Sequence, residues 1–346
     1  MSCGADADIV VVGGGPAGTA TAIWAALGGA RVTLLERSAF PRHRPGETLH
    51  PGTGALFEQL GVEARVAAAC RTRHAGIAVE WAGRRSTQTF ADANRAGYQI
   101  LRDDLDAILL ERARDVGVAI VQPSPSVAPI VDDGRVLGVR GRDLRIAASA
   151  VVDATGSAWW LGRHLGLVRE VASPPLYVHY GYCEGTLEPL RGGPSLIGDA
   201  EGWTWMAEIA PGLIHWTRLR FERSGERERP PALGALPACG PIRGADVTWR
   251  STRAAGPGYF LVGDAAAILD PSSSHGVLRA VMSGMMAAHT IGRLRAGAVD
   301  EPAAITGFVC WTTDWFQHDV SRMSALYFEL HQEADHAQDH HRRDPQ

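Results

Sequence analysis

The spacing of hydrophobic residues changes twice within the first 36 positions of the chain. Residues 9–12 form a short β-branched run, Ile-Val-Val-Val, which predicts a buried strand. Small and apolar residues then fill positions 20–27 and predict a helix, and a second β-type run at 31–35 predicts another strand. A strand, a helix and a second strand in this order predict a βαβ unit with parallel strands.

The turn between the first strand and the helix carries a glycine pattern. Gly13, Gly15 and Gly18 occupy the first, third and sixth positions of a G-x-G-x-x-G turn, and Glu36 closes the second strand. In this fingerprint the glycines permit a tight turn, a close approach of a pyrophosphate, and close helix–strand packing. The helix N-terminus offers unpaired N–H groups to phosphate, and the acid accepts ribose hydroxyls. The pattern predicts a bound dinucleotide.

A loop rich in proline and glycine spans residues 40–52 and carries Arg44, Glu47 and His50. It follows the second strand, at the edge of the sheet where such folds bind cofactors. We therefore expect Arg44 and Glu47 to line the cofactor's cleft. The alternative is a solvated basic loop.

A helix is predicted over 102–113, with Arg102 at its entry and Asp103 or Asp104 as its cap. The remaining elements expected before residue 172 are helical turns at 53–70, hairpins at 76–90 and 126–140, and strands at 118–121 and 150–153.

Between residues 172 and 249 the chain is dense in Trp, Tyr and His, in largely alternating runs. Alternation predicts a largely antiparallel sheet with aromatic side chains on one face. The pattern allows two interpretations: a sheet packed on the first domain, or a chamber for flat molecules, which we favour. The predicted substrate residues are Tyr180, Trp203, Trp205 and Trp216.

The nucleotide domain resumes near residue 258 with a buried strand that ends in Gly263-Asp264. A polar loop then enters a helix rich in small residues, and one or two further helices are expected over 302–334. The predicted domains are a discontinuous cofactor domain (1–75, 97–171 and 250–300), a substrate domain (76–96 and 172–249) and C-terminal helices with a tail (301–346).

Composition narrows the class of protein. The chain has 346 residues, of which 45% are hydrophobic and 21% are charged, and this composition is typical of a globular protein. Its net charge is −4, so we do not expect nucleic acid as a partner. No apolar run predicts a membrane span, and the N-terminus lacks a signal-peptide pattern. Five scattered cysteines without C-x-x-C pairs predict a reduced, cytoplasmic protein and no metal site.

Three segments together resemble the FAD-dependent monooxygenases of the p-hydroxybenzoate hydroxylase type and their relatives, the flavin-dependent halogenases and geranylgeranyl reductases. They are residues 13–36, the helix led by Arg102, and Gly263-Asp264 with Asp270-Pro271. The resemblance implies an α/β fold of the glutathione-reductase type, with a Rossmann-like FAD-binding domain, a mainly antiparallel substrate domain and a C-terminal helical segment. It implies that Asp264 meets the ribityl chain, and that the N–H groups of Gly276 and Val277 face the isoalloxazine ring.

The cofactor-binding residues expected from the fingerprint and the resemblance are Gly13, Gly15, Pro16, Ala17, Gly18, Glu36, Arg37, Arg44, Arg102, Gly263, Asp264, Pro271, Gly276 and Val277.

The loop at 270–280 and the Arg44-Pro45-Gly46-Glu47-Thr48 segment look closest to a halogenase-like subgroup. That subgroup includes small flavoproteins that help mature tryptophylquinone cofactors by oxygenating a peptidyl tryptophan. Residues 202–211 are similar to the halogenases' Trp-x-Trp-x-Ile-Pro motif, but with extra residues before Ile and Pro. Flavin halogenases use a catalytic lysine, and this sequence contains none, which argues against lysine-dependent halogenation.

The resemblance implies FAD-dependent hydroxylation of an electron-rich aromatic through a flavin C4a-hydroperoxide. The substrate is a small indole-like molecule or a tryptophan of a partner protein, and NAD(P)H or a flavin reductase supplies electrons. The alternatives are a reductase of the geranylgeranyl reductase type and a halogenase-like protein without halogenase activity. Candidates for the base that removes the ring proton are, in order of preference, His50, Glu47, His179 and His215.

Overall fold

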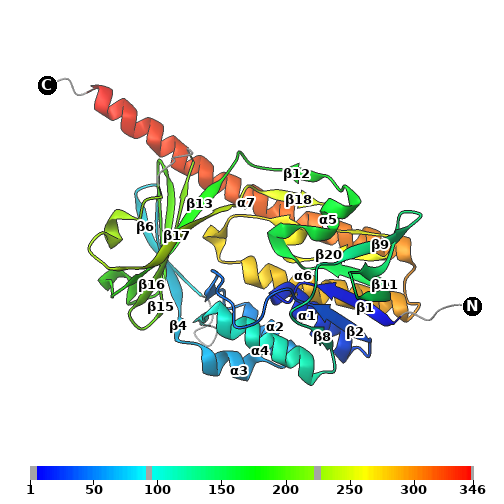
Figure 1. Ribbon diagram of the computed structural model, residues 1–346. Coiled ribbons are helices and arrows are strands. Elements are labelled where there is room, and N and C mark those ends of the chain that lie inside the picture. The colour runs from blue at the N-terminus through cyan, green and yellow to red at the C-terminus, as the bar shows by residue number, and fades with distance from the viewer. Residues whose placement is uncertain (1–5, 91–95, 222–226, 344–346) are drawn as a thin grey trace, which may run out of the picture.

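The computed structural model describes residues 6–90, 96–221 and 227–343. It contains two large sheets, shown on the right and the left of Figure 1, and a long C-terminal helix that runs along both. The expected α/β architecture, with a dinucleotide-binding half, a mainly antiparallel half and a C-terminal helical segment, is confirmed.

The first sheet is built around the β-branched run near the N-terminus. Strand β1 pairs in parallel with β2 on one side and with β11 on the other, and β8 and β20 extend the parallel order. The strands run in the order β19 (Ala255–Gly256), β20 (Tyr259–Leu261), β11 (Arg145–Asp153), β1 (Ala7–Val12), β2 (Val32–Leu35) and β8 (Ala119–Val121). The predicted βαβ unit is therefore present, with α1 (Pro16–Leu27) as its helix.

Helix α6 (Gly276–Arg295) packs closely on α1. At Gly284 an added Cβ would lie 2.3 Å from the carbonyl oxygen of Ala17, so glycine is required for this approach. The small residues of α6 thus serve helix–helix packing beside the glycine turn.

Shorter elements surround this core. They are α2 (Thr53–Leu60), α3 (Glu63–Ala69), α4 (Arg102–Asp115), α5 (Trp160–Leu165), the hairpin β9 (Ala128–Asp132) and β10 (Arg135–Arg140), the sheet β3 (Thr48–Leu49), β7 (Gly97–Gln99) and β4 (Thr72–His74), and the sheet β12 (Arg169–Val171), β18 (Arg250–Thr252) and β21 (Ala267–Ile268). The β3–β7–β4 sheet positions the loop that carries Glu47 and His50.

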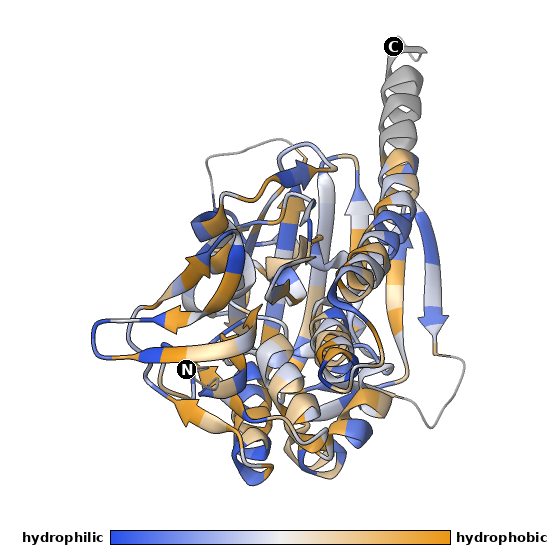
Figure 2. Cartoon of the chain, turned by 90° about the vertical axis from the view of Figure 1, so that its right-hand side faces the viewer, coloured by the Kyte–Doolittle hydropathy of each residue, from blue (hydrophilic) through white to orange (hydrophobic). Residues whose placement is uncertain are grey.

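The second sheet has seven strands and is antiparallel except where β14 pairs with β5. Its order is β17 (Ala238–Asp246), β13 (Tyr177–Glu184), β16 (Leu213–Arg220), β15 (Gly202–Ala210), β14 (Ser195–Asp199), β5 (Gly76–Trp81) and β6 (Arg84–Thr89). The hairpin predicted at 76–90 is β5–β6. Edge strand β6 is exposed and hydrophilic along its length (Figure 2), which discourages edge-to-edge pairing.

The register of this sheet sorts its aromatic residues onto two faces. Trp205 lies opposite Thr217, which lies opposite Tyr180, so all three share one face. Trp216, the neighbour of Thr217, points the other way and packs with Cys183 and other apolar residues. The expectation of aromatics on one face is therefore wrong for Trp216, because side chains alternate along a strand.

The C-terminal segment is a single helix, α7 (Glu301–Arg343), where one or two were expected. Its buried residues serve both halves: Phe308 packs edge-on against Phe260, and Tyr327 packs among the aromatics of the second sheet. None of the helices in the described ranges is long and apolar enough to cross a membrane.

Candidate functional site

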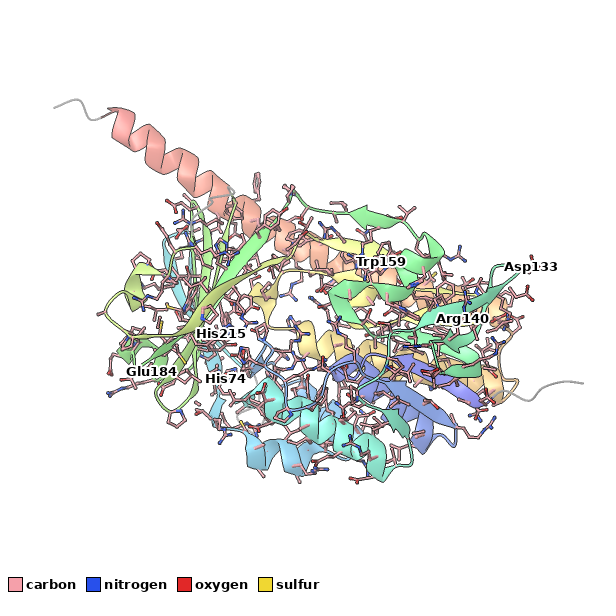
Figure 3. All side chains as sticks on the ribbon, viewed as in Figure 1. His74, Asp133, Arg140, Trp159, Glu184 and His215 are labelled. Carbon is pink, nitrogen blue, oxygen red and sulfur yellow. The ribbon has the colours of Figure 1, made fainter. Side chains whose placement is uncertain are left out.

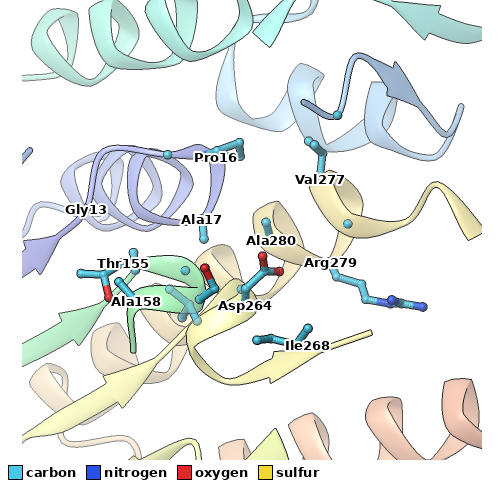
Figure 4. A pocket seen from close by; sticks show the side chains of 18 of the residues that line it. Gly13, Pro16, Ala17, Thr155, Ala158, Asp264, Ile268, Val277, Arg279 and Ala280 are labelled. Carbon is cyan, nitrogen blue, oxygen red and sulfur yellow. The ribbon is translucent and has the colours of Figure 1, made fainter. Parts of the chain in front are cut away.

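A cavity of about 810 Å³ lies between the two halves, a size typical of cofactor and ligand sites. Its walls come from the glycine turn, the loop after β2, the segment that enters α6, the inner face of the second sheet, and α7. Of the fourteen predicted cofactor residues, all except Gly18 line this cavity. Figure 4 shows Gly13, Pro16 and Ala17 on one side of it and Asp264 and Val277 on others.

Two glycines of the turn, Gly13 and Gly18, leave no room for a side chain. Gly13 has a φ of +110°, and a Cβ there would lie 2.4 Å from the carbonyl oxygen of Ala154. A Cβ on Gly18 would lie 1.8 Å from the carbonyl oxygen of Gly13. Gly15 instead faces the cavity at the start of α1, where backbone N–H groups are available to a phosphate. The cradle fits the pyrophosphate of a dinucleotide.

Glu36 lines the cavity and is held firmly. Its Oε2 accepts a hydrogen bond from the N–H of Gly14 at 2.7 Å, and its Oε1 accepts from the N–H of Ser38 at 2.7 Å. Arg42 donates to Oε1 at 3.0 Å and also reaches Asp106 at 3.4 Å. The carboxylate is thus oriented beside the place expected for the ribose. Arg42 also lines the cavity, and the sequence did not predict it, because its ion pairs with Glu36 and Asp106 form only in the folded chain.

Arg102 fixes the proline-rich loop. Its guanidinium makes two hydrogen bonds to Asp106, at 3.0 and 3.2 Å, and donates to the carbonyl of Pro45 at 3.1 Å. Burial alone would lower the pKa of Arg102, but the Asp106 carboxylate raises it, so the cation is retained. The arginine at the entry of α4 thereby ties the loop to the cofactor side of the cavity.

Asp264 follows Gly263, whose φ is +58° and whose N–H donates to Ser283 at 2.9 Å. Burial raises the pKa of Asp264, while the nearby Arg102 and Arg279 act in the opposite direction. A carboxyl group at this position is suited to accept from a hydroxyl-bearing chain such as a ribityl group. Gly276 and Val277 begin α6 and also line the cavity, with the N–H groups of a helix N-terminus.

The inner face of the second sheet closes the other end of the cavity. Trp205, Tyr180, Thr217 and His215 line it, together with Trp311 and other residues of α7. The structure therefore brings Tyr180 and Trp205, two of the four predicted substrate residues, into one cavity with the cofactor residues. No pattern in the sequence predicted that residues of α7 would line the cavity.

Glu47 and His215 are adjacent at this end. The Glu47 carboxylate is buried and accepts hydrogen bonds from the hydroxyl of Tyr182 and the N–H of Gly46, both at 2.7 Å. The Nδ1 atom of His215 lies 3.5 Å from Oε2 of Glu47, and its ring stacks on that of Tyr182. Burial lowers the pKa of His215, and the Glu47 charge opposes this. The pair can accept and stabilise a proton.

His50 lies in a different group, with His74 and His275. Its ring centroid is 4.7 Å from that of His275, and both His50 and His74 make edge contacts with Phe90. Among the described residues, Nδ1 of His74 has no hydrogen-bond partner although the residue is buried. His74 and His215 both lie where the seven-stranded sheet meets the rest of the chain (Figure 3). His74 and His275 were missed, because single histidines carry no sequence signal.

Six predicted residues are absent from the cavity lining: Gly18, Glu47, His50, His179, Trp203 and Trp216. Glu47 was expected to line it, but its carboxylate is buried against Tyr182 and His215. Trp203 shares the inner face but is covered by α7, where its Nε1 donates to the hydroxyl of Tyr327 at 2.8 Å. Trp216 and His179 point to the outer face, as their register partners require. Within the described part of the chain, no group of three or more His, Cys, Asp or Glu residues is arranged to hold a metal ion.

One cavity joins the glycine cradle and the acid beside it to the second sheet. This arrangement defines an α/β FAD-binding enzyme fold. Residues 6–172 match the family model described as FAD binding domain. This part of the chain is therefore similar to known FAD-binding domains, and the proteins that the chain resembles over most of its length include halogenases and menaquinone reductases.

Two curated relatives and one solved structure illustrate the range of enzymes to which this chain is similar. A tryptophan 2-halogenase of Chondromyces crocatus is 30% identical over 86% of this chain, but the chain spans only 63% of that enzyme's length. A menaquinone reductase of Mycobacterium tuberculosis is 29% identical, over 84% of this chain and 78% of the enzyme. The structure of the myxobacterial chondrochloren halogenase CndH superposes with a TM-score of 0.84 at 25% identity, covering 93% of this chain and 82% of that one.

Proposed function

We propose that the chain is an FAD-dependent monooxygenase that hydroxylates an electron-rich, indole-like ring, carried either by a small molecule or by a tryptophan of a partner protein. The observation that carries this proposal is the single cavity that joins Gly13 and Asp264 to Trp205, Tyr180 and His215. Aromatic walls suit a flat ring, and they exclude water from the reacting atoms.

When bound, FAD would be held by the glycine turn and Asp264 and would supply the redox chemistry, in which two electrons from outside and one dioxygen yield a hydroxylated ring carbon and water. His215 accepts the proton that the ring carbon loses, and the adjacent Glu47 carboxylate stabilises the resulting imidazolium. Tyr182 and Gly46 hold the carboxylate in place through their two hydrogen bonds.

Two electrons must reach the flavin from outside the chain. We propose that NAD(P)H docking transiently, or a partner flavin reductase, supplies them. We also propose a cytoplasmic location, supported by four cysteines that are unpaired in the described residues.

The relatives favour two other reactions, halogenation and quinone reduction. The absence of lysine from the sequence supports oxygen transfer over halogenation of the lysine-dependent kind. The relationship to menaquinone reductases keeps a reductase, the same general class as a geranylgeranyl reductase, as the second candidate function.

A single experiment separates these candidates. FAD-loaded protein is first reduced by light under anaerobic conditions. One sample is then mixed with ¹⁸O₂, bromide and a Trp-containing peptide or N-acetyl-L-tryptophanamide. A parallel sample is mixed with a menaquinone analogue in the absence of oxygen. We expect a product heavier by one ¹⁸O atom. A brominated product, or rapid flavin reoxidation by the quinone alone with no labelled product, would contradict the proposal. A Gly18→Ala variant, expected to bind FAD more weakly, is the control for reactions of free reduced flavin.

A further inference from the structure

Tyr327, on the C-terminal helix α7, contacts the carboxylate of Asp270 in the segment that enters α6. Its hydroxyl donates a hydrogen bond to Oδ2 of Asp270, which is 57 residues away along the chain. The same hydroxyl accepts a hydrogen bond from Nε1 of Trp203 at 2.8 Å, and Nε1 of Trp249 donates to Oδ2 of Asp270 at 3.1 Å. Four residues from four separate segments of the chain thus meet at one buried point.

Asp270 stands at the beginning of the segment that faces the cofactor site. Its Oδ1 accepts from the backbone N–H of Ser272 at 3.1 Å and from the Ser272 hydroxyl, so the Asp270 side chain caps the short 3₁₀ helix Pro271–Ser273. Pro271, Ser274 and Gly276, which follow, all line the cavity. The carboxylate therefore determines where this stretch of cavity wall begins.

The surroundings make this arrangement sensitive to the loss of one donor. Asp270 is 2% exposed and Trp203 and Trp249 are equally enclosed, so water cannot replace a missing partner. Burial and the neighbouring Asp270 charge raise the pKa of Tyr327, which keeps its hydroxyl protonated and donating. A buried carboxylate that lacks a hydrogen-bond donor raises the free energy of the folded state. The segment after Asp270 would therefore move until the carboxylate finds another donor.

We propose that Tyr327 is a positioning residue for the cofactor: through Asp270 it holds the segment 271–276 in the place from which that segment contacts the flavin. This role requires FAD binding but does not depend on which reaction the flavin performs. Helix α7 already lines the cavity through Trp311, and Tyr327 gives it a second, indirect connection to the cavity wall.

The test uses the full chain loaded with FAD and compares Tyr327→Phe with Phe328→Leu, a change at the next position, where the side chain is 61% exposed. Tyr327→Phe removes the donor and keeps the ring. We expect its FAD dissociation constant to rise about tenfold, as for the loss of one buried hydrogen bond. We also expect the flavin midpoint potential to become more negative, because helix N–H groups that favour the reduced, anionic flavin are displaced. Phe328→Leu should change neither value.

An unchanged dissociation constant and potential in Tyr327→Phe would overturn the proposal, even if the variant melts at a lower temperature, since that result would assign Tyr327 to stability alone. If Tyr327→Phe does not fold, Trp249→Phe removes the other donor to the same oxygen and should produce the same two shifts. Neither readout requires a substrate, so failure of the monooxygenase proposal would leave this test intact.

Discussion

Glu47 and His215 meet across the boundary between the two halves of the molecule, with 3.5 Å between Oε2 of the carboxylate and Nδ1 of the imidazole. Glu47 comes from the loop after β2, and His215 comes from strand β16 of the second sheet. Their side chains are 1% and 7% exposed, so bulk water screens the interaction of the Glu47 charge with the His215 imidazole only weakly. The fold thus brings two separately predicted candidates into contact.

Replacing Glu47 with Gln should reduce hydroxylation about 10²- to 10⁴-fold, the usual contribution of a positioned proton acceptor. The neutral amide no longer opposes the effect of burial, so the pKa of His215 falls further and the imidazole becomes a weaker base. Product formation and bound FAD are measured together. Tyr182→Phe, which removes one hydrogen bond to the carboxylate but keeps its charge, should show a smaller loss. Equal losses in both variants, or full activity in Glu47→Gln, would contradict this assignment.

Gly18→Ala should weaken FAD binding by about ten- to a hundredfold, because its Cβ would lie 1.8 Å from the carbonyl oxygen of Gly13 and would push the turn open. The measurement is a fluorescence titration of the apoprotein with FAD. Gly292→Ala, on α6, is the matched control, since an added Cβ there meets no atom within 4 Å. Equal affinities in the two variants would show that the turn does not cradle the cofactor.

Trp205→Phe should weaken binding of N-acetyl-L-tryptophanamide by about two- to tenfold, the range of one aromatic contact. Trp216→Phe should leave binding unchanged, since Trp216 faces the opposite side of the same sheet. Binding is followed through the change that the ligand causes in the flavin spectrum. A loss in Trp216→Phe equal to that in Trp205→Phe would mean that the ring does not bind on the inner face.

The stability of the fold should decrease as the pH falls from 7 towards 5. Burial lowers the pKa of His74 to about 4 and that of His275 to about 3, whereas unfolded histidines titrate near 6.5. Between these values the unfolded chain binds more protons, so stability rises with pH and is lost on acidification. The neighbouring charges on Arg73, His50, Arg279 and Arg322 act in the same direction.

Urea unfolding at pH 7 and at pH 5 measures this loss, which is at most about 1.4 kcal/mol per pH unit for each imidazole. His74→Gln, which cannot titrate, should show a shallower dependence than the unchanged chain. An identical slope in the two proteins would mean that His74 does not remain neutral in the fold.

Much of the cofactor half was predictable because local rules govern it. A β-branched run, a glycine turn, a helix and an acid lie within 36 consecutive residues, and their spacing alone implies parallel strands around a phosphate site. The substrate half was predicted less well. The alternation of residues 202–220 could have separated Trp216 from His215, since neighbouring residues in a strand cannot share a face. Trp203 could not be placed in this way, because α7, more than 100 residues later, covers it.

The sequence by itself determined the class of fold, the dinucleotide fingerprint and most of the residues that line the cavity beside the glycine turn, since these depend on backbone conformation and short-range spacing. Only the tertiary structure decided which distant side chains meet. It paired Glu47 with His215 and Tyr182, gathered His50, His74 and His275 into one group, and joined Tyr327 to Asp270. Such pairings depend on how the two sheets and α7 pack, and that packing is set by burial of apolar surface across the whole chain rather than by any local pattern.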